Sequence, residues 1–70
     1  MKLGEATEIL KVMQLKTVTP NTLHRIIGSS WHKNNVALKE LEQHGLVTKI
    51  SGRYVITGKG RKMLQLLLFG

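Results

Sequence analysis

The chain has 70 residues and no cysteine, and its eleven Lys and Arg residues against four acidic residues, all Glu, give a formal net charge of +7. A chain this short forms one domain with a small core, so we expect a single domain over residues 1–70. Without cysteine, a disulfide framework and a thiolate metal site are excluded. The positive charge favours a polyanion as partner over a generic basic surface.

No part of the sequence predicts a secretion signal or a membrane segment. The first residues lead into Glu5 and Glu8 instead of an apolar stretch. The longest apolar run, residues 66–69, is far shorter than the roughly 20 residues that a membrane-spanning helix needs. We therefore expect no membrane association and a cytoplasmic protein.

The first predicted element is an amphipathic helix over residues 5–15. Ala6, Ile9, Leu10 and Met13 recur at i, i+3, i+4 and i+7, which places them on one face of a helix. That face is predicted to pack into the core.

A second, short helix is predicted to begin at Pro20. Thr19 is a favoured N-cap, and proline at the first helical position lacks only an N–H that has no helical partner there. Gly28 can end the helix in a left-handed cap. The inward side chains are expected to be Leu23, Ile26 and Ile27.

A third helix is predicted over residues 31–44, after a turn made by Ser29 and Ser30. Either serine can cap this helix, and Gly45 can end it. Its inward residues are expected to be Ala37, Leu38 and Leu41.

Beyond the third helix the pattern changes to the alternation that is typical of β-strands. Residues 46–50 and 53–57 are predicted to be two strands, and the two-residue turn Ser51-Gly52 between them predicts a tight hairpin. Tyr54 is expected to pack beneath the hairpin. The basic residues that flank the tip are Lys49 and Arg53.

A fourth helix is predicted over residues 58–69, with Thr57 as its cap and two glycines, Gly58 and Gly60, that weaken its first turn. The order helix, helix, helix, strand, strand, helix predicts an α+β fold that is mostly helical. The apolar positions of the last helix are Met63, Leu64, Leu67 and Leu68.

Three segments of this chain resemble the winged helix-turn-helix family, especially its compact archaeal and archaeal-virus regulators. They are the helix, Gly-Ser-Ser turn and helix of residues 20–44, the stretch LKELEQHGLV over residues 38–47, and the stretch GRYVITGKG over residues 52–60. Together they cover about two-thirds of the chain, and the resemblance depends on their combination.

The resemblance implies a winged helix-turn-helix with its wing over residues 46–57. It also implies sequence-specific binding of double-stranded DNA, a role in transcription regulation and, with these, association with the nucleoid. The third helix would then lie in the major groove, and the wing would contact flanking backbone or the minor groove.

The chain departs from the family pattern near the start of its third helix. Asn34 stands where the family usually has an apolar or β-branched residue. We expect Trp31 to supply the missing packing, because a lone Trp in so small a domain is more often part of the core than a nucleic-acid contact.

Candidate DNA contacts lie on the outward face of the third helix. Asn can pair with adenine, Lys can reach guanine or phosphate, and an apolar side chain can touch a thymine methyl. The alternative for each position is a solvated surface residue. The candidates are His32, Lys33, Asn35, Val36 and Lys39.

Further candidates lie at the helix start and on the hairpin. Ser29 and Ser30 are expected phosphate anchors, because a helix N-terminus presents free N–H groups. Lys49, Ser51 and Arg53 adjoin the hairpin turn, where basic side chains can meet phosphates or the minor groove. The alternative is a charged edge that prevents aggregation.

Apolar residues near both ends of the chain favour a homodimer. The last helix carries more apolar surface than one face can bury, and a two-fold dimer would present two third helices one DNA turn apart. The alternative is that Leu67 and Phe69 fold back onto their own domain. The residues expected at the interface are Leu3, Val12, Leu15, Leu66, Leu67 and Phe69.

We expect no catalytic site, metal or cofactor. The three histidines lack metal-ligand spacing, and the four glutamates predict no paired carboxylates. Two other functions stay open: a winged-helix module for protein interaction in a larger complex, and a sequence-independent architectural or RNA-binding protein. The basic residues of the third helix and the hairpin argue against the first of these.

Overall fold

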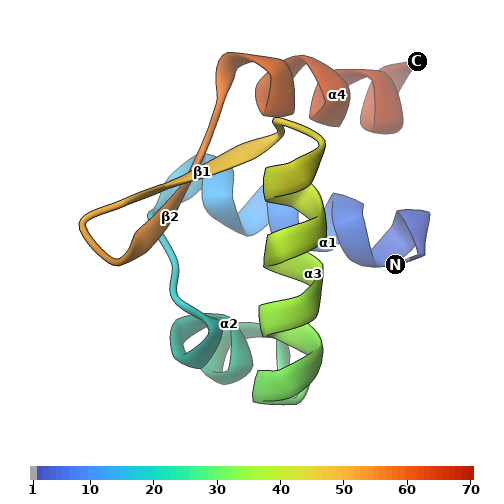
Figure 1. Ribbon diagram of the computed structural model, residues 1–70. Coiled ribbons are helices and arrows are strands. Elements are labelled where there is room, and N and C mark those ends of the chain that lie inside the picture. The colour runs from blue at the N-terminus through green and yellow to red at the C-terminus, as the bar shows by residue number, and fades with distance from the viewer. Residues whose placement is uncertain (1) are drawn as a thin grey trace.

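The computed structural model describes residues 2–70, which form three helices, a β-hairpin and a fourth helix in chain order (Figure 1). The α+β order and the mostly helical character are as predicted, and the element boundaries differ from the predicted ones by at most two residues. The elements are α1 Leu3–Leu15, α2 Pro20–Ile27, α3 Trp31–Gln43, β1 Val47–Ile50, β2 Arg53–Ile56 and α4 Gly58–Phe69.

Three helices begin at a side-chain cap that the sequence predicted. The hydroxyl oxygens of Thr19, Ser30 and Thr57 each accept a hydrogen bond from the backbone N–H three residues later, at 3.2, 3.1 and 3.0 Å. Each cap satisfies an N–H that has no partner inside its helix. Gly28 ends α2 in the left-handed conformation, with φ of 77°, as predicted.

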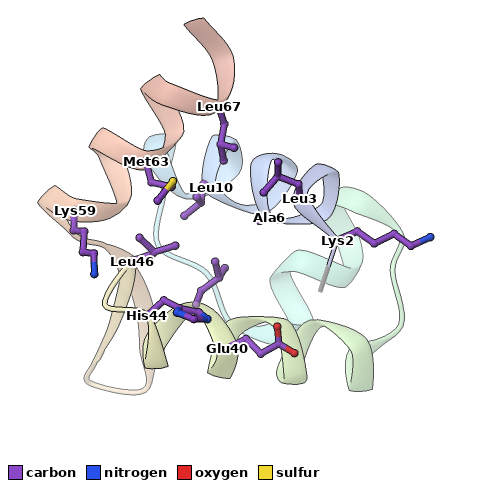
Figure 2. Close-up of a pocket in the computed structure, with 11 residues that line it drawn as sticks. Lys2, Leu3, Ala6, Leu10, Glu40, His44, Leu46, Lys59, Met63 and Leu67 are labelled. Carbon is purple, nitrogen blue, oxygen red and sulfur yellow. The ribbon is translucent and has the colours of Figure 1, made fainter. Parts of the chain in front are cut away.

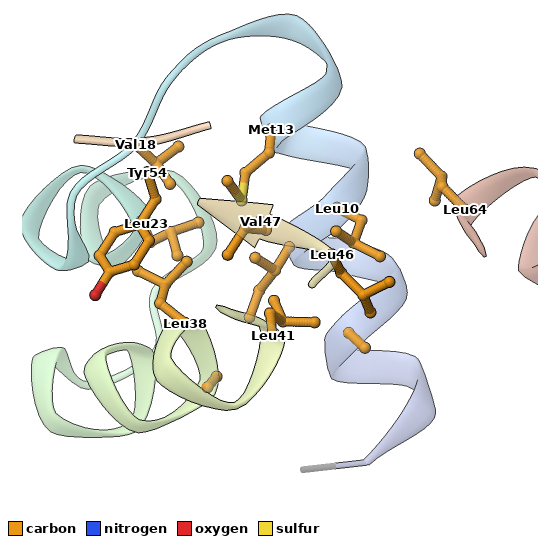
Figure 3. Packing of buried hydrophobic residues seen from close by; sticks show 13 residues of the cluster. Leu10, Met13, Val18, Leu23, Leu38, Leu41, Leu46, Val47, Tyr54 and Leu64 are labelled. Carbon is orange, nitrogen blue, oxygen red and sulfur yellow. The ribbon is translucent and has the colours of Figure 1, made fainter. Parts of the chain in front are cut away.

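One hydrophobic core contains side chains from all six elements (Figure 3). Helix α1 packs against α4 and β2, while α3 packs against α2 and β1. The largest fully buried apolar side chains are Leu10, Leu23, Leu38, Leu41, Leu64, Val18 and Val47.

The hairpin is joined to the rest of the molecule by a backbone bridge that the sequence did not predict. The Val18 N–H donates to the Tyr54 carbonyl at 3.0 Å, and the Tyr54 N–H donates to the Val18 carbonyl at 2.8 Å. Both side chains are buried, which agrees with the predicted position of Tyr54 beneath the hairpin. The segment between α1 and α2 therefore pairs with β2 as a short additional strand.

The hairpin itself is antiparallel and tightly turned. Val47 pairs with Ile56 at its base, and Ile50 pairs with Arg53 at its tip. Ser51 and Gly52 both have positive φ, at 50° and 80°, which is typical of the two-residue turns that match strand twist.

Ile26 is exposed, although the pattern predicted it to face the core. Leu68 of α4, which was predicted only as an apolar position, is exposed as well. Helix α2 is short and its main packing partner is α3, so only Leu23 is fully buried and Ile27 is partly buried. A helix that packs on one side buries a narrower stripe than its apolar pattern suggests.

The six residues expected at a dimer interface fall into two groups. Val12 and Leu67 are partly buried against the protein's own core, so Leu67 does fold back onto its domain. The other four are exposed: Leu3, Leu15, Leu66 and Phe69.

Gly60 is required by a close contact between the start of α4 and the residue before β1. A β-carbon at this position would overlap the Leu46 carbonyl oxygen and lie 2.8 Å from Cγ1 of Ile56. That same Leu46 carbonyl accepts a hydrogen bond from the Thr57 N–H at 3.0 Å. Gly60 therefore does more than weaken the helix start, because it lets α4 approach the hairpin base.

Gly60→Ala is expected to lower the free energy of unfolding by about 1–3 kcal/mol, because the added methyl group meets backbone that cannot move freely. Gly58→Ala is the matched control: nothing lies within 4 Å of its β-carbon position, so alanine there should be neutral or slightly stabilising. Urea unfolding of both variants measures the difference. Equal midpoints would contradict the close approach of α4.

Candidate nucleic-acid interface

Helix α3 has one buried face and one face open to solvent. Its buried residues, Asn34, Ala37, Leu38 and Leu41, point toward the body of the protein. Successive residues turn by about 100°, so the opposite face is formed by exposed side chains at i, i+4, i+7 and i+11. These residues are His32, Val36, Lys39 and Gln43.

Three of these four were candidates from the sequence, and Gln43 was missed. Gln43 follows Lys39 by four residues on the same face, so the helical period could have found it. Asn35 is half-buried at the edge of this outward face.

Lys33 lies at the α1 side of α3 and not at the centre of the outward face. It lines two shallow hollows between α1 and α3, which Glu5, Glu8 and Glu40 also line. These carboxylates offset its positive charge locally, so Lys39 is the better placed cation on α3 for a polyanion.

A buried amide holds the start of α3 against α2. Asn34 is only 2% exposed, and its Nδ2 donates to the carbonyls of Pro20 and Ser29, each at 3.3 Å. The Ser29 carbonyl also accepts from Nδ1 of His24 at 2.5 Å. These hydrogen bonds join both ends of α2 to the first turn of α3.

The expectation that Trp31 replaces an apolar residue at position 34 is wrong. Trp31 is 53% exposed, and Asn34 itself occupies the buried position. The Asn34 amide donates there to the carbonyls of Pro20 and Ser29, and an apolar side chain could not make these hydrogen bonds. Trp31 is therefore an exposed aromatic side chain at the start of α3, a residue that sequence reasoning set aside as core.

The turn before α3 presents both predicted serines near the helix N-terminus. The Ser30 hydroxyl caps the helix, and Ser29 is half-buried. The first backbone hydrogen bond of α3 runs from the Asn34 N–H to the Ser30 carbonyl at 3.0 Å. The Lys33 N–H bonds to the Ser30 hydroxyl, so it is the N–H groups of Trp31 and His32, with the helix dipole, that favour an anion at this end.

The hairpin presents exposed basic and polar side chains around its turn. Lys49, Ser51 and Arg53 are all exposed, as is the apolar Ile50 between them. The Lys49 ammonium lies 5.6 Å from the centre of the Tyr54 ring, a cation–π distance that steadies the long side chain. In Figure 1 the hairpin extends from α3 on the side away from the N-terminal end of α1.

Charge is distributed unevenly along the chain. All eleven Lys and Arg side chains are exposed. Residues 9–39 and 43–70 contain five basic residues each and no acidic residue. The acids are confined to Glu5 and Glu8 in α1 and to Glu40 and Glu42 in the last turn of α3.

Substitutions of Asn34 should lower the free energy of unfolding, and the hydrogen bonds that each variant loses should determine the size of the loss. Asn34→Ala removes two hydrogen bonds from a buried position and is expected to cost about 1–3 kcal/mol of unfolding free energy. Asn34→Asp should cost more, because a buried carboxylate would face two carbonyl oxygens. Asn35→Asp on the neighbouring, half-buried residue is the control, with an expected change of about 0.5 kcal/mol or less. Denaturant unfolding tests this order, and equal stability of the two Asp variants would contradict it.

Residues 2–70 contain no group of three or more His, Cys, Asp or Glu side chains placed to hold a metal ion. Within that range no helix has the length and apolar character to cross a membrane. In comparisons with known proteins, no family model, curated protein or solved structure matches this chain.

Proposed function

We propose that this protein is a winged-helix transcription regulator that binds double-stranded DNA sequence-specifically. Helix α3 enters the major groove, and the hairpin acts as a wing on flanking backbone or the minor groove. The observation that carries this proposal is the outward face of α3, which is exposed over the helix length while the helix is anchored from behind by Asn34.

The size and anchoring of α3 suit a groove-reading helix. Its 13 residues make a rod of roughly 20 Å, and the major groove is wide enough to admit one α-helix. Helix α2 braces it through the buried amide, as a helix that crosses the backbone would. His32 and Lys39 can donate to bases or phosphates, and Val36 can contact a thymine methyl.

The charge pattern favours the N-terminal part of α3 as the end that enters the groove. Residues 31–39 contain no acid, whereas Glu40 and Glu42 occupy the last turn. The helix dipole also places partial positive charge at the start of α3. Ser29, Ser30 and the exposed Trp31 at this end are then beside the sugar-phosphate backbone.

The hairpin supplies a second contact at a set distance from α3. The Val18–Tyr54 bridge holds β2 to the segment that precedes α2, so the hairpin cannot pivot freely. Arg53 at the tip is suited to the negative potential of a narrow minor groove, and Lys49 to phosphate. The four outward residues of α3 and these two cations form one proposed surface.

Binding to duplex DNA is expected to weaken steeply with salt. Each neutralised phosphate contributes about −0.9 to the slope of log affinity against log salt concentration, so four to six such contacts should cost roughly 100- to 1000-fold between about 50 and 200 mM salt. Fluorescence anisotropy with labelled duplexes measures this slope. An affinity for DNA that does not change with salt concentration would contradict the proposal.

Variants that each lose one positive charge are expected to distinguish DNA binding through the proposed surface from attraction by the overall positive charge of the protein. Lys39→Ala and Arg53→Ala should each weaken DNA binding by about tenfold, because each removes a direct contact. Lys11→Ala on α1 removes the same charge from an exposed position outside this surface and should have a much smaller effect. Equal losses in all three variants would show that only net charge matters.

A further inference from the structure

The two strands of the hairpin place alternate side chains on an inner and an outer face. Residues that pair across two strands share a face, and successive residues of one strand point to opposite faces. The pairs Val47–Ile56 and Lys49–Tyr54 form the inner face, where Val47 and Tyr54 are buried and the Lys49 ammonium lies over the Tyr54 ring. The other two pairs consequently point outward.

At the hairpin turn, the outer face ends in an apolar and a basic side chain that are neighbours. Ile50 pairs with Arg53, and both residues are exposed, Ile50 at 57%. Only Ser51 and Gly52 lie between them in the chain, and nothing lies within 4 Å of a β-carbon at Gly52. The tip is therefore slim, and its isoleucine is open to solvent.

Both residues of the tip pair are next to an anchored neighbour. Val18 exchanges two backbone hydrogen bonds with Tyr54, the residue directly after Arg53. Lys49, directly before Ile50, lies over the ring of the same tyrosine. Because the tip is held in this way, binding through it loses little conformational entropy.

The charges around the tip suit a polyanion better than those of the apolar groove between α1, the end of α3 and α4. That groove, of about 310 Å³, is lined by Glu40 as well as by Lys2 and Lys59, so it carries both signs of charge (Figure 2). The hairpin contains Lys49 and Arg53 and no acidic residue. Proteins that enter the minor groove of DNA combine such cations with an apolar wedge that opens a base step.

We propose that Ile50 is a wedge that enters the minor groove beside the α3 site, partly opens one base step and bends the DNA. This inference rests on the proposed function, because it requires that the hairpin lies on DNA as a wing. Arg53, the cross-strand neighbour of Ile50, enters the same groove and is attracted by its negative potential. A wedge of this kind bends a duplex by roughly 20–90° toward the major groove.

The wedge selects a class of DNA site that α3 alone would not select. Pyrimidine–purine steps, TA and CA/TG, are the easiest to unstack, whereas A-tracts are stiff. A preferred site then has two parts, the bases that α3 reads and a flexible step beside them. The spacing between the parts is fixed, because the Val18–Tyr54 bridge and the Asn34 hydrogen bonds hold the hairpin and α3 in set positions.

Selection of duplexes from random-sequence DNA by the full chain tests the wedge. The wild type is expected to enrich one motif for α3 together with a TA or CA/TG step at a fixed spacing. Ile50→Thr keeps a β-branched residue in the strand but replaces the apolar end of the side chain with a hydroxyl, so it should enrich the same motif without the step. Val55→Thr is the matched control, because it makes a similar change on the same face at a half-buried position away from the tip, and it should keep the step. Circular dichroism confirms that each variant is folded.

Bending of a selected duplex gives a second readout. With a donor and an acceptor dye at the two ends of a duplex of about 30 base pairs, energy transfer should rise when the wild type binds and rise much less with Ile50→Thr. The same variant should bind this duplex about three- to tenfold more weakly, and Ile50→Leu should restore both the bend and the affinity.

Two results would overturn the wedge and leave DNA binding in place. One is a wild type that enriches a motif without a flexible step, and the other is an Ile50→Thr complex that is as bent as the wild-type complex. A wild type that enriches no duplex would overturn the wedge and the proposed function together.

Discussion

The backbone pair between Val18 and Tyr54 determines where the hairpin stands relative to the helices. A two-stranded hairpin is at best marginally stable alone, so β1 and β2 need a further contact to hold a set position. Val18 supplies it directly before α2 begins, and its side chain is fully buried with that of Tyr54 in the core. The hairpin therefore has a defined position relative to α2, and through the buried amide of Asn34 it has one relative to α3.

Local signals in the sequence predicted the elements well. The hydroxyl caps of Thr19, Ser30 and Thr57 bond to N–H groups three residues away, so a short window of sequence is enough to find them. The tight turn of the hairpin can likewise be predicted from its two residues, Ser51 and Gly52. The three decisive tertiary contacts, at Val18, Asn34 and Gly60, join residues that are distant in the chain, and no local pattern encodes them.

The sequence predicted which side of α3 faces outward, but it did not predict which residues of other elements lie next to that helix. Helical period places His32, Val36 and Lys39 on the outward side once the buried stripe is known. The helical period does not predict that α1 brings Glu5 and Glu8 beside Lys33, because that contact depends on how α1 and α3 pack. Trp31 was misplaced for a related reason: a polar residue was not expected to occupy the buried position, yet Asn34 is buried there with its amide hydrogen-bonded to two backbone carbonyls.

Exposed basic side chains and exposed apolar side chains gather on different parts of the molecule. Cations and polar side chains face outward on α3 and the hairpin, while exposed apolar side chains gather at the end of α4. All four acids lie in α1 and in the last turn of α3, so the hairpin contains no acidic residue, and at the start of α3 the nearby carboxylates, those of Glu5 and Glu8, lie on the Lys33 side. A surface of this kind binds a polyanion by charge and can read it through a helix.

Amide chemical shifts recorded while duplex DNA is added test this account most directly, because they locate the contact residue by residue. The account predicts the largest changes at the start and outward face of α3, from residue 29 to residue 39, and at residues 49–53 of the hairpin, with small changes along the outer side of α4. Changes centred on α4, or spread evenly over every exposed lysine, would contradict the placement of α3 and the hairpin on DNA.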